Sequence, residues 1–146
     1  MKKNVQQQIV QFNRMFKRYD DIYRRAAKKF DLPELALWII YVLRENTKCT
    51  QKDIVEQLLH SKQSIHSSLK VLEKKGYVKL ECLEDDRRSK YVSLTEKGLS
   101  LARDTADKIV AAENLAFLRL TDTEREVILN MFERLTSILE EEMEKI

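Results

Sequence analysis

The chain has 146 residues, of which 43% are hydrophobic and 35% charged. This length and composition indicate one compact, helix-rich globular domain and exclude a disordered chain. No run reaches the roughly 20 apolar residues of a membrane helix, and the start lacks the apolar segment of a secretion signal, so we expect a cytoplasmic protein without membrane contact. The net charge of +3 is unevenly divided: residues 1–97 are basic overall and residues 98–146 acidic. This basic bias is compatible with nucleic-acid binding but does not establish it.

One proline and two glycines in the whole chain predict a mostly helical protein. Residues 4–29 carry an apolar residue at every third or fourth position, which predicts a long amphipathic helix. We expect Asp31 to end this helix and to cap the next one, with Pro33 in its first turn. Residues 34–46, "ELALWIIYVLREN", are apolar nearly all round and predict a buried central helix.

Two shorter helices are expected next. Thr50 followed by Asp53 resembles a capping box and starts the first of them. Ser61 is expected to cap the second, which runs to Gly76, where a left-handed residue typically closes a helix.

The periodicity then changes from helical to alternating. "YVKLECL" at 77–83 and "KYVSL" at 90–94 predict two strands of a hairpin around 84–89. Thr95 is expected to cap one unbroken helix over 96–120. Thr121 with Glu124 then forms the capping box of the last helix. The central order, short helix, turn, helix and two-stranded wing, is that of a winged helix-turn-helix, whose second helix enters a major groove.

The outward face of this second helix is polar and carries no carboxylate before Glu73, which suits contact with phosphates. Gln63 can pair with adenine, and Lys62 or His66 with guanine acceptors, while the serines can bind phosphates or base edges. A solvated polar face is the alternative interpretation. The candidate DNA contacts on this face are Ser61, Lys62, Gln63, Ser64, His66, Ser67 and Lys70.

The hairpin tip, "EDDRRS", presents two adjacent arginines. An arginine there can enter a narrow minor groove, and a neighbouring aspartate can hold its guanidinium in place. A charged, solvated turn is the alternative. The tip and the helix together favour nucleic-acid contact.

Residues 85–98, "DDRRSKYVSLTEKG", follow "LKVLEKKGYVKLE" and resemble the wing signature of the MarR (multiple-antibiotic-resistance regulator) family. The signature falls without a gap on Asp86, Arg88, Leu94, Thr95 and Gly98. The helix order resembles the family over essentially the whole chain. The resemblance implies a mainly α fold, a six-helix winged helix-turn-helix with a two-stranded β-hairpin wing.

The resemblance also implies a homodimer that binds a pseudo-palindromic operator in double-stranded DNA. Arg88 would be the minor-groove arginine, buttressed by Asp86, with Arg87 and Lys90 on phosphates. Glu81 departs from the family, which often has an arginine near this position. The single domain 1–146 would comprise a DNA-binding lobe at about 33–98 and dimerisation helices at about 4–30 and 99–146.

A repressor released by a small-molecule or redox effector is the expected mode of action. By the resemblance, an effector pocket would lie between the dimer helices and the DNA-binding lobe, lined by Phe12, Phe16, Trp38 and Tyr41. An ordinary core is the alternative interpretation of these aromatic residues.

Cofactor and metal sites are not expected. Cys49 and Cys82 form no CxxC motif and are expected to be reduced, partly buried thiols, with a redox-sensing thiol as the alternative. His60 and His66 have no third histidine with which to build a metal site.

Enzymatic activity is not expected either. No nucleophile is visibly paired with a histidine, and two glycines cannot form a phosphate-cradling loop. The remaining alternative is a winged-helix module that binds a protein partner and does not read DNA sequence.

Overall fold

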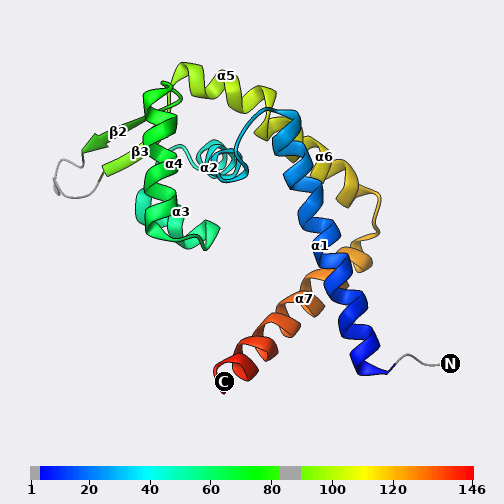
Figure 1. Cartoon of the computed structure of the whole chain (residues 1–146). Coiled ribbons are helices and arrows are strands. Elements are labelled where there is room, and N and C mark those ends of the chain that lie inside the picture. The colour runs from blue at the N-terminus through cyan, green and yellow to red at the C-terminus, as the bar shows by residue number, and fades with distance from the viewer. Residues whose placement is uncertain (1–3, 83–89) are drawn as a thin grey trace. The chain divides into compact units, whose positions relative to one another are not determined.

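The fold is described from a computed structural model, which places residues 4–82 and 90–146 (Figure 1). The chain divides into two compact units, residues 1–109 and residues 110–146, and each is described by itself. None of the helices within these described ranges is long and apolar enough to cross a membrane.

Most of the secondary structure lies in the first unit. Its elements are α1 Val5–Lys29, α2 Glu34–Glu45, β1 Cys49–Thr50, α3 Gln51–Leu58, α4 Lys62–Lys74, β2 Val78–Cys82, β3 Lys90–Leu94 and α5 Glu96–Asp104. Helix α6 (Ala106–Leu118) begins in this unit and continues into the second, which also contains α7 (Asp122–Met143). The expected fold class, a mainly helical winged helix-turn-helix, is confirmed.

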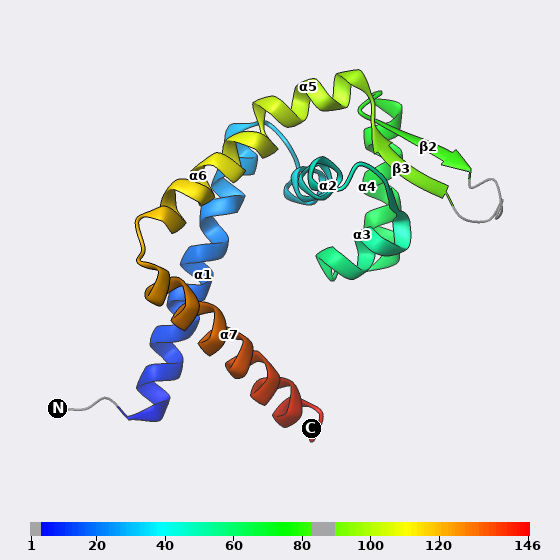
Figure 2. The same ribbon diagram turned by 180° about the vertical axis from the view of Figure 1, so that it is seen from behind.

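Helix α2 is the centre of the first unit, as expected. Ile39 and Ile40 are fully buried, and the helix packs in one core with Ile54 of α3, Leu69 of α4 and Val92 of β3. Both views show α2 between α1 and α4 (Figures 1 and 2). An apolar helix with neighbours on several sides gains most of its stability from burial.

The caps of the helix-turn-helix are confirmed. The Thr50 hydroxyl accepts the Asp53 N–H at 3.2 Å, and the Asp53 carboxylate accepts the Thr50 N–H at 2.7 Å. The Thr50 N–H and the Thr50 hydroxyl both donate to the Asp53 carboxylate, and these two hydrogen bonds hold the pKa of Asp53 below its ordinary value. Ser61 caps α4 by accepting the Ser64 N–H at 3.1 Å. Each bond satisfies an N–H group that the helix start leaves without an internal partner.

The expectation that Asp31 caps α2 is wrong. Asp31 adopts a left-handed conformation with φ 55°, and it closes α1. The N–H groups of Asp31 and Leu32 donate to the carbonyls of Lys28 and Ala27, the pattern of a Schellman motif. The N-cap of α2 is Pro33, which provides no side-chain cap. The backbone of Asp31 is therefore committed to ending the preceding helix.

The two expected strands of the hairpin are confirmed, and a third strand, β1, extends them into a small sheet. β2 and β3 pair antiparallel with Leu80 opposite Val92, and the sheet order is β1-β3-β2. β1 places Cys49 opposite Val92 on the other edge of β3. Cys49 is buried, which raises the pKa of its thiol, whereas Cys82 is exposed, contrary to the expected partial burial.

The two glycines lie just before and just after the hairpin, at positions where the backbone requires a glycine. Gly76 is the left-handed closing residue of α4, with φ 77°. Thr95 caps α5, and its hydroxyl also donates to the Gly76 carbonyl at 2.5 Å. A Cβ atom on Gly98 would lie 1.9 Å from the Tyr77 carbonyl oxygen, which is far too close. The Leu-Thr-x-x-Gly pattern at 94–98 therefore has a structural reason, a close approach of α5 to the backbone at Tyr77.

The expectation of one unbroken helix over 96–120 is wrong. Thr105 interrupts it with φ −128° and ψ −80°, and separates α5 from α6. Thr105 is buried, and its hydroxyl donates back to the Leu101 carbonyl at 2.7 Å, a bond that commonly bends helices. The first turn of α6 is tied to α2 by a two-bond ion pair between Arg44 and Asp107, at 2.8 and 3.1 Å.

In the second unit, the Thr121–Glu124 capping box of α7 is confirmed. Arg125 donates to the carbonyls of Phe117 and Leu120 and so ties α7 to the turn before it. Helix α7 has no buried residue along its 22 positions. Its apolar stripe is therefore exposed in the single chain.

Candidate nucleic-acid interface

Helix α4 is oriented by its apolar face. Ile65, Leu69 and Leu72 are each at most 2% exposed and pack into the core, so the opposite face of the helix is turned outward. The structure confirms this exposure for every residue expected on that face, namely Ser61, Lys62, Gln63, Ser64, His66, Ser67 and Lys70.

The outward face carries the positive charges of Lys62 and Lys70 and no acidic residue before Glu73. No acidic residue lies in the first turn of α4, and the helix N-terminus adds a partial positive charge. Among residues 4–82 and 90–146, no carboxylate forms an ion pair with Lys62 or Lys70. Both ammonium groups are therefore available to phosphates.

Sequence reasoning missed the contact that joins α3 to this face. The Gln51 amide oxygen lies 3.3 Å from Nδ1 of His66, and its amide nitrogen donates to the Lys62 carbonyl at 3.5 Å. The partners are 15 and 11 residues apart in sequence, and no local pattern signals the contact. Packing of α3 against α4 creates it.

Only the base of the wing is described. Lys90, the first residue of β3, is exposed and pairs with Cys82 of β2. The other wing candidates, Asp86, Arg87 and Arg88, lie outside the described residues. Nearby, Lys79 forms an exposed 2.9 Å ion pair with Glu81, which lowers the pKa of Glu81 and offsets its negative charge.

The four candidate effector residues fall into two groups. Trp38 and Tyr41 on α2 form an aromatic cluster with Tyr23 of α1, with ring centroids 4.9 and 5.5 Å from Trp38. Phe12 and Phe16 stack on each other at 6.3 Å along α1. Trp38 and Tyr41 are half-buried, whereas Phe16 is 51% exposed. This clustering is compatible with ordinary packing as well as with a binding role.

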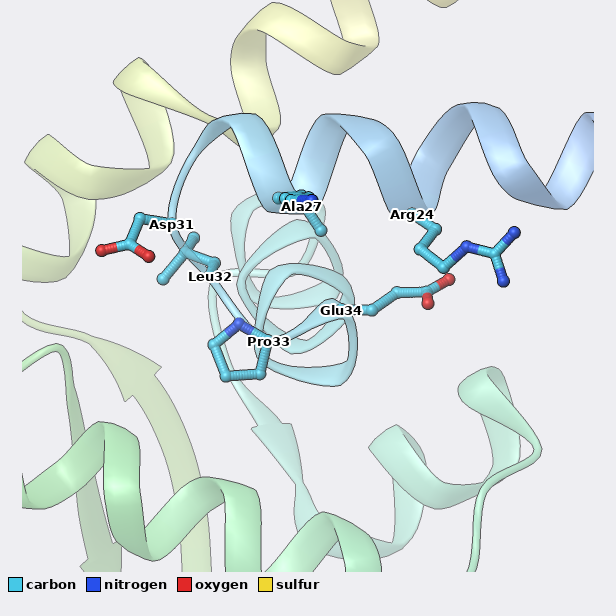
Figure 3. A pocket seen from close by; sticks show the side chains of 7 residues that line it. Arg24, Ala27, Asp31, Leu32, Pro33 and Glu34 are labelled. Atoms are coloured by element: carbon cyan, nitrogen blue, oxygen red, sulfur yellow. The ribbon is translucent and has the colours of Figure 1, made fainter.

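A pocket of about 410 Å³ lies where α1 ends and α2 begins. None of the four aromatic candidates lines it. Arg24 and Glu34 extend from the two helices on the same side of the pocket, and the connecting segment with Asp31, Leu32 and Pro33 lies on the other side (Figure 3). The lining residues are Arg24, Ala27, Lys28, Asp31, Leu32, Pro33 and Glu34.

The described part of the chain contains no cluster of side chains that could bind a metal ion. No group of three or more histidine, cysteine or acidic residues is placed there to hold a metal ion.

A comparison with known protein families finds a match in the region that contains α3 and α4. Residues 30–89, which contain α2 to β2, match the family model described as the MarR family. Over 98 residues the chain is 26% identical to YwhA, an uncharacterized HTH-type transcriptional regulator of Bacillus subtilis (strain 168), covering 67% of this chain and 70% of that relative.

Two solved structures share the fold. NMB1585, a MarR family regulator from Neisseria meningitidis, superimposes with a TM-score of 0.82 at 22% identity, over 94% of this chain and 97% of that one. Sco3205, a MarR family transcriptional regulator from Streptomyces coelicolor solved in complex with DNA, has a TM-score of 0.73 at 20% identity, over 94% of each chain. The match in fold thus extends well beyond the 30–89 segment.

Proposed function

We propose that the chain is a winged-helix transcriptional regulator of the MarR family, and that it acts as a homodimer that represses transcription from a pseudo-palindromic operator. The relatives are transcriptional regulators, and the proposal includes no enzymatic activity. Because its target is DNA, the proposal also places the protein in the cytoplasm.

The exposed face of α4, which has no acidic residue before Glu73, is the observation that carries the DNA-binding role. Its residues combine phosphate ligands, the lysines and serines, with Gln63 and His66, which can form hydrogen bonds to base edges. We assign major-groove contact to this face. By sequence, Arg88 would occupy the minor groove with Asp86 as its buttress, and Arg87 and Lys90 would contact phosphates.

Exposed apolar residues support the homodimer. In α1 they include Val5, Ile9, Phe16 and Ile22, and nine apolar side chains of α7 are between 42% and 59% exposed. A monomeric protein rarely exposes apolar stripes of this length to water. We therefore infer that a second copy of the chain buries them. The first helix is basic and the last acidic, which favours docking one against the other. We therefore assign residues 4–30 and 99–146 to the dimer and residues 33–98 to the DNA-binding lobe.

Two α4 helices related by a two-fold axis would read half-sites about one helical turn apart. We further propose that an effector changes their separation and so releases the DNA. Trp38 and Tyr41, with Phe12 and Phe16, remain the candidate effector contacts. The alternative is a winged-helix module that binds a protein partner, and it becomes one outcome of the following test.

The test is selection of duplexes from a random-sequence library by the purified protein, at about 150 mM salt to suppress nonspecific phosphate binding. Enrichment of an inverted repeat with half-sites about 10 bp apart is the expected result. A folded, dimeric protein that enriches no sequence would contradict the proposal and favour the protein-binding module.

Substitution of the proposed minor-groove arginine tests the wing. Arg88→Ala should weaken binding to the selected operator by about 10- to 100-fold without changing the thermal unfolding midpoint. Arg103→Ala, which removes an exposed arginine of α5, is the matched control for the change of charge. Equal operator affinity of the two variants, measured by fluorescence anisotropy, would remove Arg88 from the interface.

A further inference from the structure

We propose that Gln51 sets the tautomer of His66 and thereby determines which base α4 reads at that position. The inference rests on the proposed DNA-binding function and adds to it a positioning residue on α3. The observation behind it is the bridge that Gln51 forms between two groups of α4.

The orientation of the Gln51 amide follows from its two partners. The main-chain carbonyl of Lys62 can only accept a hydrogen bond, so it takes the amide NH₂ end, at 3.5 Å. The amide oxygen is then the end that faces His66, 3.3 Å from Nδ1. Gln51 is half-buried at the start of α3, which limits the rotamers that its side chain can adopt.

This orientation places a proton on Nδ1 of His66. An amide oxygen can only accept, so the ring nitrogen that faces it has to donate. In the neutral imidazole the other nitrogen, Nε2, is then unprotonated and acts as an acceptor. Because His66 lies on the exposed face of α4, Nε2 is the ring nitrogen left for DNA.

An acceptor selects bases that present a donor. In the major groove these are adenine, through its N6 amino group, and cytosine, through its N4 amino group, whereas guanine presents the acceptors N7 and O6. The structure therefore assigns His66 to adenine or cytosine. From sequence, either Lys62 or His66 could contact guanine. With His66 as an acceptor, Lys62 is the candidate that remains, because its ammonium group has donors only.

The first experiment reads the tautomer directly, without DNA. Nitrogen-15 NMR of the full-length protein, at a pH where the imidazole is neutral, should show the proton of His66 on Nδ1. Gln51→Ala should shift the His66 resonances toward a mixture of both tautomers. Gln57→Ala, an exposed glutamine of the same helix, should leave them unchanged. A proton on Nε2 of His66 in the unsubstituted protein would overturn the inference.

The second experiment reads the base preference. Duplex selection with His66→Ala identifies the operator position that loses its preference. Wild-type protein should favour adenine or cytosine there by about fivefold, the value of one net hydrogen bond. Gln51→Ala should reduce that preference below about twofold. The double variant, Gln51→Ala with His66→Ala, should show no further loss of the preference. The control Gln57→Ala should keep the preference of the wild-type protein.

The two proposals fail in different ways. If the wild-type protein enriches no sequence, the DNA-binding function fails and the base assignment fails with it. If the wild-type protein enriches an inverted repeat but Gln51→Ala selects an identical motif, or guanine is preferred at the His66 position, only the role of Gln51 is overturned.

Discussion

Helices α2 and α7 differ in two ways that do not go together: the strength of their N-terminal capping and the number of residues that they bury. α7 is 22 residues long and starts with a complete capping box, yet it buries no residue. α2 is 12 residues long and begins at Pro33 without a side-chain cap, yet six of its residues are buried. Local signals thus determine where a helix begins, whereas burial determines which helix supports the fold. α7 is a well-specified helix that lacks a cover, which is why we assign it to a subunit interface.

The largest expected effect is at the junction that closes the α2 core. Gly98→Ala should destabilise the protein by about 3 kcal/mol or more, because the added methyl would overlap the Tyr77 carbonyl and force α5 away from the hairpin. Chemical denaturation monitored by circular dichroism measures the change. Ser100→Ala, an exposed residue of the same helix, should change stability by less than about 0.5 kcal/mol. Equal effects of the two variants would show that the close approach is not required.

Truncation of α7 separates folding from assembly. Removal of residues 136–146 deletes Ile138, Leu139 and Met143 from the apolar stripe, so the dimer should dissociate at micromolar concentration. The buried apolar residues of the described chain lie between Ala27 and Ile109, and a cooperative unfolding transition should remain. Light scattering measures the mass. A stable dimer after truncation would place the interface elsewhere.

The capping boxes of α3 and α7 sharpen the same comparison. Thr50→Ala should destabilise the core-packed helix-turn-helix by about 1 kcal/mol, since α3 loses its N-cap. Thr121→Ala removes the equivalent cap from α7, where hydrogen exchange should increase in the first turn while the exchange rates of the α2 amides stay unchanged. Faster exchange throughout α2 in Thr121→Ala would contradict this separation.

The smallest effect is a gain in stability at the turn between α3 and α4. Leu59 is 90% exposed and left-handed, with φ 51°, so Leu59→Gly should stabilise the protein by about 0.5–1 kcal/mol by relieving backbone strain without loss of packing. His60→Gly, at an exposed neighbour without a positive φ, serves as the control and should not stabilise. A loss of stability in Leu59→Gly would mean that the strain is negligible.

Local sequence determined the features whose partners lie within a few residues. The caps at Thr50, Ser61 and Thr121, the left-handed closure at Gly76 and the alternating strands each depend on neighbours that a short window contains. The same holds for the polar outer face of α4, because its buried stripe repeats with the helical period. The winged helix-turn-helix could be predicted from these features, since they are consistent with one another.

Tertiary structure decided the contacts between residues distant in sequence. β1 finds its partner on β3 some 40 residues away, and the need for glycine at position 98 arises from the carbonyl of Tyr77. Gln51 reaches His66 only because α3 packs against α4, and Thr105 ends a helix that the apolar pattern would have continued. The fold thus follows from short-range signals, whereas the chemistry of the outward face of α4 depends on packing that no local window contains.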